Sequence, residues 1–245
     1  MAEEERLLSE VGGRHTVTAR REFFCCLLAD ATRAVAPEFV YARHVGRYEG
    51  DESFIKWAFI GDTGGVRDKT AIFKAGYSHD LKKVVIRSEL TFEPKTPTPK
   101  ITAQYKLWAN GGNIDAEAPP LIIDAPGQTL VDIAEFGLRA SLPIKAVFAA
   151  GIQQLNAALY NDAILIDPDC ILLITTLTAG LLTKNQTDFE RTITLGHCDA
   201  AAALIYTLRH IDKVTDLRPA PKASQVWAAN AKTGKTRTDL KRAFL

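Results

Sequence analysis

The spacing of the apolar residues changes about halfway along the chain, and no other feature constrains the fold as strongly. Between residues 39 and 109, short runs rich in β-branched and aromatic residues alternate with turns that contain Gly, Asp and Asn. Such runs are typical of an antiparallel sheet with short connections. From about residue 128 the apolar positions recur at helical spacing, most clearly at 144, 148, 152, 155 and 159. The sequence therefore predicts an α+β fold, with an antiparallel β-rich N-terminal half, a mainly helical C-terminal half and extended terminal arms.

The pattern also assigns individual elements to ranges. Strands are expected at 39–48, 53–61, 70–78, 82–93 and 100–109, and residues 93–100 are expected to form a stiff, Pro-rich connection. Asp167 followed by Pro168 has the form of a helix N-cap with Pro at the first helical position. Residues 187–190 (TDFE) have the form of a capping box, which predicts a second helix that starts there.

A second Pro-rich stretch, residues 116–127, marks the expected boundary between the two halves. Four segments result: an acidic N-terminal arm (1–15), a helix plus an antiparallel β-rich domain (16–118), a helical domain (119–217), and a linker with a basic C-terminal arm (218–245).

Cysteine usage and hydropathy indicate an intracellular protein without a membrane partner. The four cysteines, at 25, 26, 170 and 198, form no CxxC pair, so we expect reduced, buried thiols. The apolar run 170–182 is too short to span a bilayer. The N-terminus opens with Glu3, Glu4 and Glu5, unlike a secretory signal. We expect a cytoplasmic location, or one within a virion.

No motif for catalysis, a metal or a cofactor is convincing in the sequence. GKT at 234–236 lacks the earlier Gly of a phosphate loop, because Ala229 stands there. His197 and Cys198 are neighbours on an expected helix and point in different directions, so they cannot act as an attacking pair. Asp167 and Asp169 are explained by helix capping, and the five histidines show no metal-ligand spacing. We therefore expect no catalytic residue, no metal and no cofactor.

Cations mixed with aromatic residues in the predicted sheet suggest a surface for nucleic acid, because cations hold phosphates and rings stack on bases. The alternative is an ordinary solvated sheet face, since Asp51, Asp62 and Glu89 dilute the charge. The predicted nucleic-acid contacts are eight cations: Arg43, Arg47, Lys56, Lys82, Lys83, Arg87, Lys100 and Lys106.

Opposite charges collect at the two ends of a chain whose net charge is only +1. The first ten residues hold four carboxylates and one arginine, whereas the last fifteen hold five cations and one anion. Complementary arms with apolar anchors favour head-to-tail assembly of identical subunits, although the arms could equally fold back on their own subunit. The predicted oligomerisation residues are Leu7, Leu8, Trp227, Lys235, Arg237, Leu240, Lys241, Arg242 and Phe244.

The leading hypothesis is a non-enzymatic, self-assembling protein that coats nucleic acid, RNA in preference to DNA. It resembles a viral nucleocapsid or coat subunit in organisation only: a homo-oligomer, filamentous or closed, built from a core with exchangeable arms. Two alternatives stay open. One is an intracellular enzyme with a site between the halves that uses His197 or His44 with acidic partners. The other is a protein-interaction module that does not bind nucleic acid.

Overall fold

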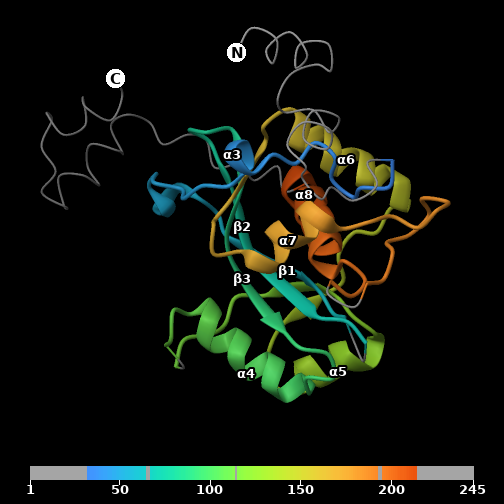
Figure 1. Cartoon of the computed structure of the whole chain (residues 1–245). Coiled ribbons are helices and arrows are strands. Elements are labelled where there is room, and N and C mark those ends of the chain that lie inside the picture. The colour runs from blue at the N-terminus through green and yellow to red at the C-terminus, as the bar shows by residue number, and fades with distance from the viewer. Residues whose placement is uncertain (1–31, 65–66, 114, 193–194, 214–245) are drawn as a thin grey trace, which may run out of the picture.

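A mixed six-stranded sheet organises the computed structural model, which describes residues 32–64, 67–113, 115–192 and 195–213 (Figure 1). The strand order is β5-β4-β1-β2-β3-β6. The central strands β1 (Ala58–Asp62), β2 (Thr70–Ser78) and β3 (Lys83–Phe92) form an antiparallel meander. The outer strands run parallel to their inner neighbours: β4 (Leu121–Asp124) to β1, β5 (Ala140–Ser141) to β4, and β6 (Ile164–Ile166) to β3. The predicted α+β class is confirmed.

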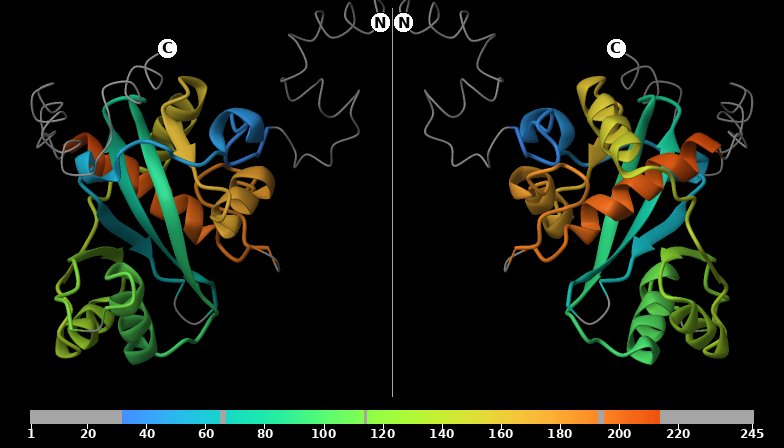
Figure 2. Two further views of the ribbon diagram at one scale, coloured as in Figure 1. Left: turned by 90° about the vertical axis from the view of Figure 1, so that its left-hand side faces the viewer. Right: turned by 90° about the vertical axis from the view of Figure 1, so that its right-hand side faces the viewer.

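Both faces of the sheet are covered, and the alternation of side chains along β2 shows how. Ala71, Phe73 and Ala75 join an apolar cluster with α6 (Phe148–Tyr160), α7 (Ile171–Ala179) and α8 (Asp199–Lys213). Ile72 points the other way, into a cluster with α4 (Thr98–Ala109) and α5 (Gly127–Glu135). Figure 2 shows α8 crossing the strands of the sheet, whereas α4 and α5 lie near one end of the strands.

Two predicted strands are helices in the structure. Residues 39–48 contain the short helix α3 (Tyr41–His44), and 100–109 belong to α4. Pro97 and Pro99 precede and open α4, where proline is pre-organised for a helix and its missing N–H costs nothing. Ile101 and Tyr105 then recur one turn apart and are both buried. A 3-10 turn, η1 (Glu52–Phe54), also takes the start of the strand predicted at 53–61.

The two predicted helix starts are also wrong. The long C-terminal helix α8 begins at Asp199, not at residue 187, because residues 182–190 form a hairpin-like turn in which Leu182 bridges Phe189. Helix α7 begins at Ile171, and Asp167 instead caps the preceding turn, where its Oδ1 accepts a hydrogen bond from the Asp169 N–H at 3.1 Å.

The expected domain boundary at 118 lies within a continuous sheet, since β4, β5 and β6 follow it in the chain and join β1–β3. That boundary stays a prediction. Cys170 and Cys198 are buried free thiols. Among the described helices, none is long and apolar enough to cross a membrane. Both terminal arms, with all nine predicted oligomerisation residues, lie outside the described residues.

Candidate active site

Three aspartates from distant parts of the sequence lie near one another at one end of the sheet. Asp62 is the last residue of β1 and Asp124 the last of β4. The two strands are parallel neighbours, and these residues are directly paired in register, so their side chains leave the sheet together. Asp199 opens α8, which packs across β1 and β2. Carboxyl ends of parallel strands are where open α/β sheets commonly place their ligands.

Burial and mutual repulsion make this cluster electrostatically unfavourable. Burial, and then the charges of Asp199 and Asp124, raise the pKa of Asp62 to about 9. The pKa of Asp199 is raised to about 7, first by burial and then by the nearby carboxylate of Asp68. Among the residues that the structure describes, none gives the buried Asp199 Oδ2 atom a hydrogen bond. A buried carboxylate oxygen without a partner, among other carboxylates, is an arrangement that a bound cation would stabilise.

Asp124 is held by groups on both sides of its carboxylate. Lys145 Nζ lies 2.8 Å from Oδ1, and the Tyr206 hydroxyl donates a hydrogen bond to Oδ2 at 2.8 Å. The backbone carbonyl of Asp124 accepts hydrogen bonds from the hydroxyl and the N–H of Thr63, at 2.7 and 2.9 Å. Burial, followed by the hydrogen bond to Asp124, raises the pKa of Tyr206, so this tyrosine remains a donor.

A fourth carboxylate, Asp68, lies in the loop after β1 and is neutralised by Arg191. The guanidinium makes two parallel bonds, Nε to Oδ1 at 3.0 Å and Nη2 to Oδ2 at 2.7 Å. Gly196 turns the chain into α8 with a φ of +62°, and a Cβ there would lie 2.9 Å from Asp68 Oδ1. Glycine therefore satisfies both the turn and the close approach of Asp68 to the start of α8.

The donor atoms of this cluster suit a hard divalent cation such as Mg²⁺ or Mn²⁺, because all of them are carboxylate oxygens. Within the described residues, no three Asp, Glu, His or Cys side chains already stand close enough to hold an ion. The case for a divalent cation here therefore rests on two points. All the candidate ligand atoms are carboxylate oxygens, and Asp199 Oδ2 has no hydrogen-bond partner in the described part of the chain.

Comparison with known proteins gives a structural likeness only. No protein-family model matches the sequence, and no curated protein matches it. The large terminase of a thermophilic bacteriophage superposes with a TM-score of 0.59 at 13% identity, over 75% of this chain and 45% of that one. The P22 large terminase nuclease domain gives a TM-score of 0.57 at 12% identity, over 76% of this chain and 97% of that one. The nuclease domain of the large terminase from bacteriophage SPP1, solved with bound Mn, gives a TM-score of 0.51 at 16% identity, over 68% of this chain and 95% of that one. The chain thus spans about half of the thermophilic phage protein but nearly all of the P22 domain, and at these identities the likeness establishes the fold alone.

These findings overturn the leading functional hypothesis. The prediction of a non-enzymatic coat or nucleocapsid protein that forms filaments is wrong, because the fold is that of terminase nuclease domains. Buried carboxyl groups with raised pKa values are also common in active sites. The enzyme alternative agrees better with the structure.

The eight cations predicted to contact nucleic acid do not form one surface. Arg43 lies on α3 and Lys106 on α4, at opposite ends of the molecule in Figure 1. Several are engaged within the fold: Arg43 pairs with Asp162 at 2.8 Å, and Lys106 Nζ donates to the Phe136 carbonyl at 2.5 Å. The others lie at a range of positions: Lys56 before β1, Lys82 and Lys83 at the β2–β3 turn, and Lys100 on α4. Their role in nucleic-acid binding stays a prediction.

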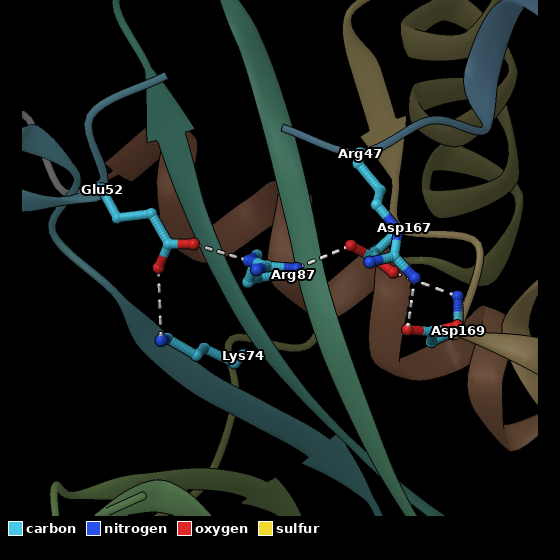
Figure 3. A network of polar contacts seen from close by, with 6 residues as sticks. All are labelled: Arg47, Glu52, Lys74, Arg87, Asp167 and Asp169. Atoms are coloured by element: carbon cyan, nitrogen blue, oxygen red, sulfur yellow. Dashed lines mark hydrogen bonds and ion pairs between the residues drawn. The ribbon is translucent and has the colours of Figure 1, made fainter. Parts of the chain in front are cut away.

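Arg87 and Arg47 take part in a polar network that joins three elements (Figure 3). Arg87 is the extra residue of a β-bulge, because Lys74 pairs with Ser88 and Ala75 with Ile86. Its guanidinium bonds Glu52 and the buried Asp167, each at 2.6 Å. Arg47 pairs with Asp169 at 3.2 Å. The network fastens η1 and the β6–α7 turn to β3, which is a structural role.

The two histidines of the enzyme alternative bond to groups other than the four aspartates. His44 is fully buried; its Nδ1 accepts the Val40 N–H at 2.9 Å, so Nε2 carries the proton and donates to the Leu159 carbonyl at 2.9 Å. His197 Nε2 lies 3.1 Å from Asp188 Oδ1. In the described part of the chain, neither ring bonds to any of the four aspartates.

Sequence analysis missed the cluster, although part of it left a signal. Asp62 and Asp124 each end an apolar run, in AFIGD and LIID, as a carboxylate at the end of a buried strand does. Asp199 follows His197 and Cys198 in GHCD and does not end an apolar run, so it carries no comparable local pattern.

Proposed function

We propose that this chain is a metal-dependent nuclease that cuts DNA, with Asp62, Asp124 and Asp199 at its active site. The observation that carries the proposal is the convergence of these three carboxylates, two from paired strand ends and one from α8. The likeness to terminase nuclease domains supports it, and relatives of this fold were solved with bound magnesium and manganese. Because the chain covers 45% of the large terminase of the thermophilic phage, the proposal concerns the nuclease step alone.

Asp62, Asp124 and Asp199 are the residues that would hold Mg²⁺ or Mn²⁺. When bound, such a cation stabilises charge on the phosphate and lowers the pKa of a coordinated water. The chain's own groups prepare the site. Tyr206 and Lys145 fix the orientation of the Asp124 carboxylate. Arg191 holds Asp68 beside Asp199, and the Lys145 ammonium, which is 61% exposed, is positioned to meet a phosphate that approaches Asp124.

The test is cleavage of plasmid DNA by the purified chain with Mg²⁺ or Mn²⁺, with EDTA as the metal-free reference and RNA as a second substrate. Asp62→Asn, Asp124→Asn and Asp199→Asn should each lower the cleavage rate by about 100-fold or more, because electrostatic stabilisation is a dominant catalytic effect. Asp169→Asn is the matched control, since Asp169 is exposed and pairs with Arg47 away from the cluster. A wild type that cuts neither substrate, or three variants that cut normally, would contradict the proposal.

A further inference from the structure

A pocket of about 110 Å³ adjoins the carboxylate cluster, between the start of α6 and the middle of α8. Its walls combine aromatic rings with two cations: Lys145, Phe148, Phe189, Tyr206 and Arg209. Lys145 and Tyr206 are the two side chains that hold Asp124. The pocket therefore shares two walls with the candidate active site.

Arg209 is a buried cation without an anionic partner in the part of the chain that the structure describes. The residue is 8% exposed, and Nη2 donates one long hydrogen bond to the Val147 carbonyl at 3.4 Å. A guanidinium offers five N–H donors, so most of its hydrogen-bonding capacity is available to a ligand. Burying most of a charge without a counter-charge is costly, and an anion in the pocket would offset that cost.

The Arg209 guanidinium lies close against helix α6 at Gly151. Gly151 lies inside α6, and a Cβ there would come 2.6 Å from Arg209 Nη2. A second side-chain atom, Ile205 Cγ2, would lie 2.9 Å from the same Cβ. Gly151 therefore leaves room for the guanidinium to lie directly against α6, at the wall of the pocket.

We propose that this pocket binds a phosphate group of the nucleic-acid strand next to the phosphate that is cut, with Arg209 as its main contact. The inference rests on the nuclease proposal, because the ligand is the same substrate. Planar guanidinium groups recognise phosphates through paired hydrogen bonds. Phe148 and Phe189 pack edge to face at 4.9 Å between ring centroids and form an apolar wall of the pocket. An apolar wall lowers the local dielectric constant and so strengthens the attraction between Arg209 and a phosphate. Lys145 lies between the pocket and Asp124 and would bridge the two phosphate positions.

The test is Arg209→Met, with Arg139→Met as the matched control because the exposed guanidinium of Arg139 pairs with Glu117 outside the pocket. Binding of a fluorescent single-stranded DNA oligonucleotide is measured against salt concentration without divalent cations. Arg209→Met should raise the Kd about tenfold and reduce the slope of log Kd against log salt by about 0.7, the value for one phosphate contact on a single strand. Arg139→Met should behave as wild type.

Thermal unfolding supplies a readout that a purely structural arginine would not give. Arg209→Met should melt at the same temperature as wild type or higher, because it removes an unpaired buried charge. Inorganic phosphate should raise the melting temperature of the wild type and not that of Arg209→Met.

Three results would overturn the inference: unchanged DNA affinity and salt slope, a lower melting temperature that alone accounts for the loss, or equal stabilisation of both proteins by phosphate. If DNA is cleaved in an Asp62-dependent manner while Arg209→Met binds normally, the pocket assignment fails and the nuclease proposal stands. If the wild type neither cuts nor binds nucleic acid, both fail.

Discussion

Among the three proposed metal ligands, Asp124 is the one for which the described residues supply a contact to each carboxylate oxygen. Tyr206 and Lys145 each contact one of its oxygens at 2.8 Å, and Thr63 holds its backbone carbonyl. Groups that orient a metal ligand affect cation affinity almost as strongly as the ligand itself. Tyr206 therefore acts as a positioning residue, and its effect is measurable without following the reaction.

Tyr206→Phe keeps the ring and removes only the hydroxyl that donates to Asp124 Oδ2. We expect the Kd for Mn²⁺, measured by calorimetric titration, to rise about tenfold, because the Asp124 carboxylate becomes free to rotate. The control is Tyr48→Phe, which removes a hydroxyl that donates to Asp80 at 3.2 Å, away from the cluster. An unchanged Mn²⁺ affinity in Tyr206→Phe would show that the hydroxyl does not position Asp124.

The sequence gives a local signal for Asp62 and Asp124 individually, but it does not predict that these residues lie side by side in the fold. AFIGD and LIID each end a buried strand in a carboxylate, and that local pattern is visible in the sequence. Their direct pairing depends on β4 lying parallel to β1, a contact between residues 62 positions apart. Lys145 and Arg209 acquire their roles only through the packing of α6 and α8, which no local pattern records.

At the level of elements, the local sequence pattern predicts helices and strands correctly where the spacing of buried apolar residues and the helix or strand propensity agree. β2 has the predicted bounds, β3 lies within its predicted range, and α6 follows its amphipathic stripe. It failed for α4, whose β-branched and aromatic residues favour a strand, while Pro97 and Pro99 allow a helix that buries Ile101 and Tyr105. It also failed for α7, whose start depends on a side chain from another element.

That side chain is Glu89 of β3, which caps α7 from outside. Its carboxylate accepts the N–H groups of Leu172 at 2.7 Å and Leu173 at 3.1 Å, and the N-cap residue of α7 itself supplies no side-chain bond. Glu89→Ala leaves these two buried N–H groups unpaired, so the free energy of unfolding should fall by about 1–3 kcal/mol. Glu93→Ala, at the exposed end of the same strand region, is the control for loss of a carboxylate. Denaturant titration at neutral pH measures both, and equal stability of Glu89→Ala and wild type would contradict the capping role.

Glu89 also gives the fold a pH dependence. Burial raises its pKa against the opposing effect of the α7 N–H groups. A carboxyl whose pKa is higher when folded stabilises the fold fully below its unfolded pKa, and this contribution is lost as pH rises through the folded pKa. Glu89→Gln does not titrate. The free energy of unfolding of Glu89→Gln, relative to that of wild type, should therefore increase as the pH rises through the pKa of Glu89, in the same denaturation assay. A change in the opposite direction would show that the N–H groups outweigh burial.

In the whole molecule, the candidate site depends on the sheet being continuous across the two halves of the sequence. β1 comes from the β-rich half, whereas β4 and α8 follow residue 118, and the cluster exists only where they meet. The α+β class follows from composition and period, because those are local properties. The parallel pairings of β4 with β1 and β6 with β3 are long-range, so the sequence pattern did not predict them.

The carboxylate cluster should weaken the whole fold in the absence of a cation, as active sites that place like charges together commonly do. At neutral pH the folded protein must keep Asp62 protonated, because its pKa is about 9, whereas the unfolded chain ionises this carboxyl. Asp62→Asn removes that cost without changing shape, so in EDTA the variant should be more stable than wild type by about 0.5–2 kcal/mol. Mg²⁺ should raise the melting temperature of the wild type, by the linkage between binding and folding, and should raise that of Asp62→Asn far less. Asp169→Asn, which changes an exposed carboxylate paired with Arg47, should respond to Mg²⁺ as the wild type does. Calorimetric scans with and without Mg²⁺ measure all three proteins. If Asp62→Asn melts lower than wild type in EDTA, Asp62 stabilises the fold, and the cluster is then a structural network and not a cation site.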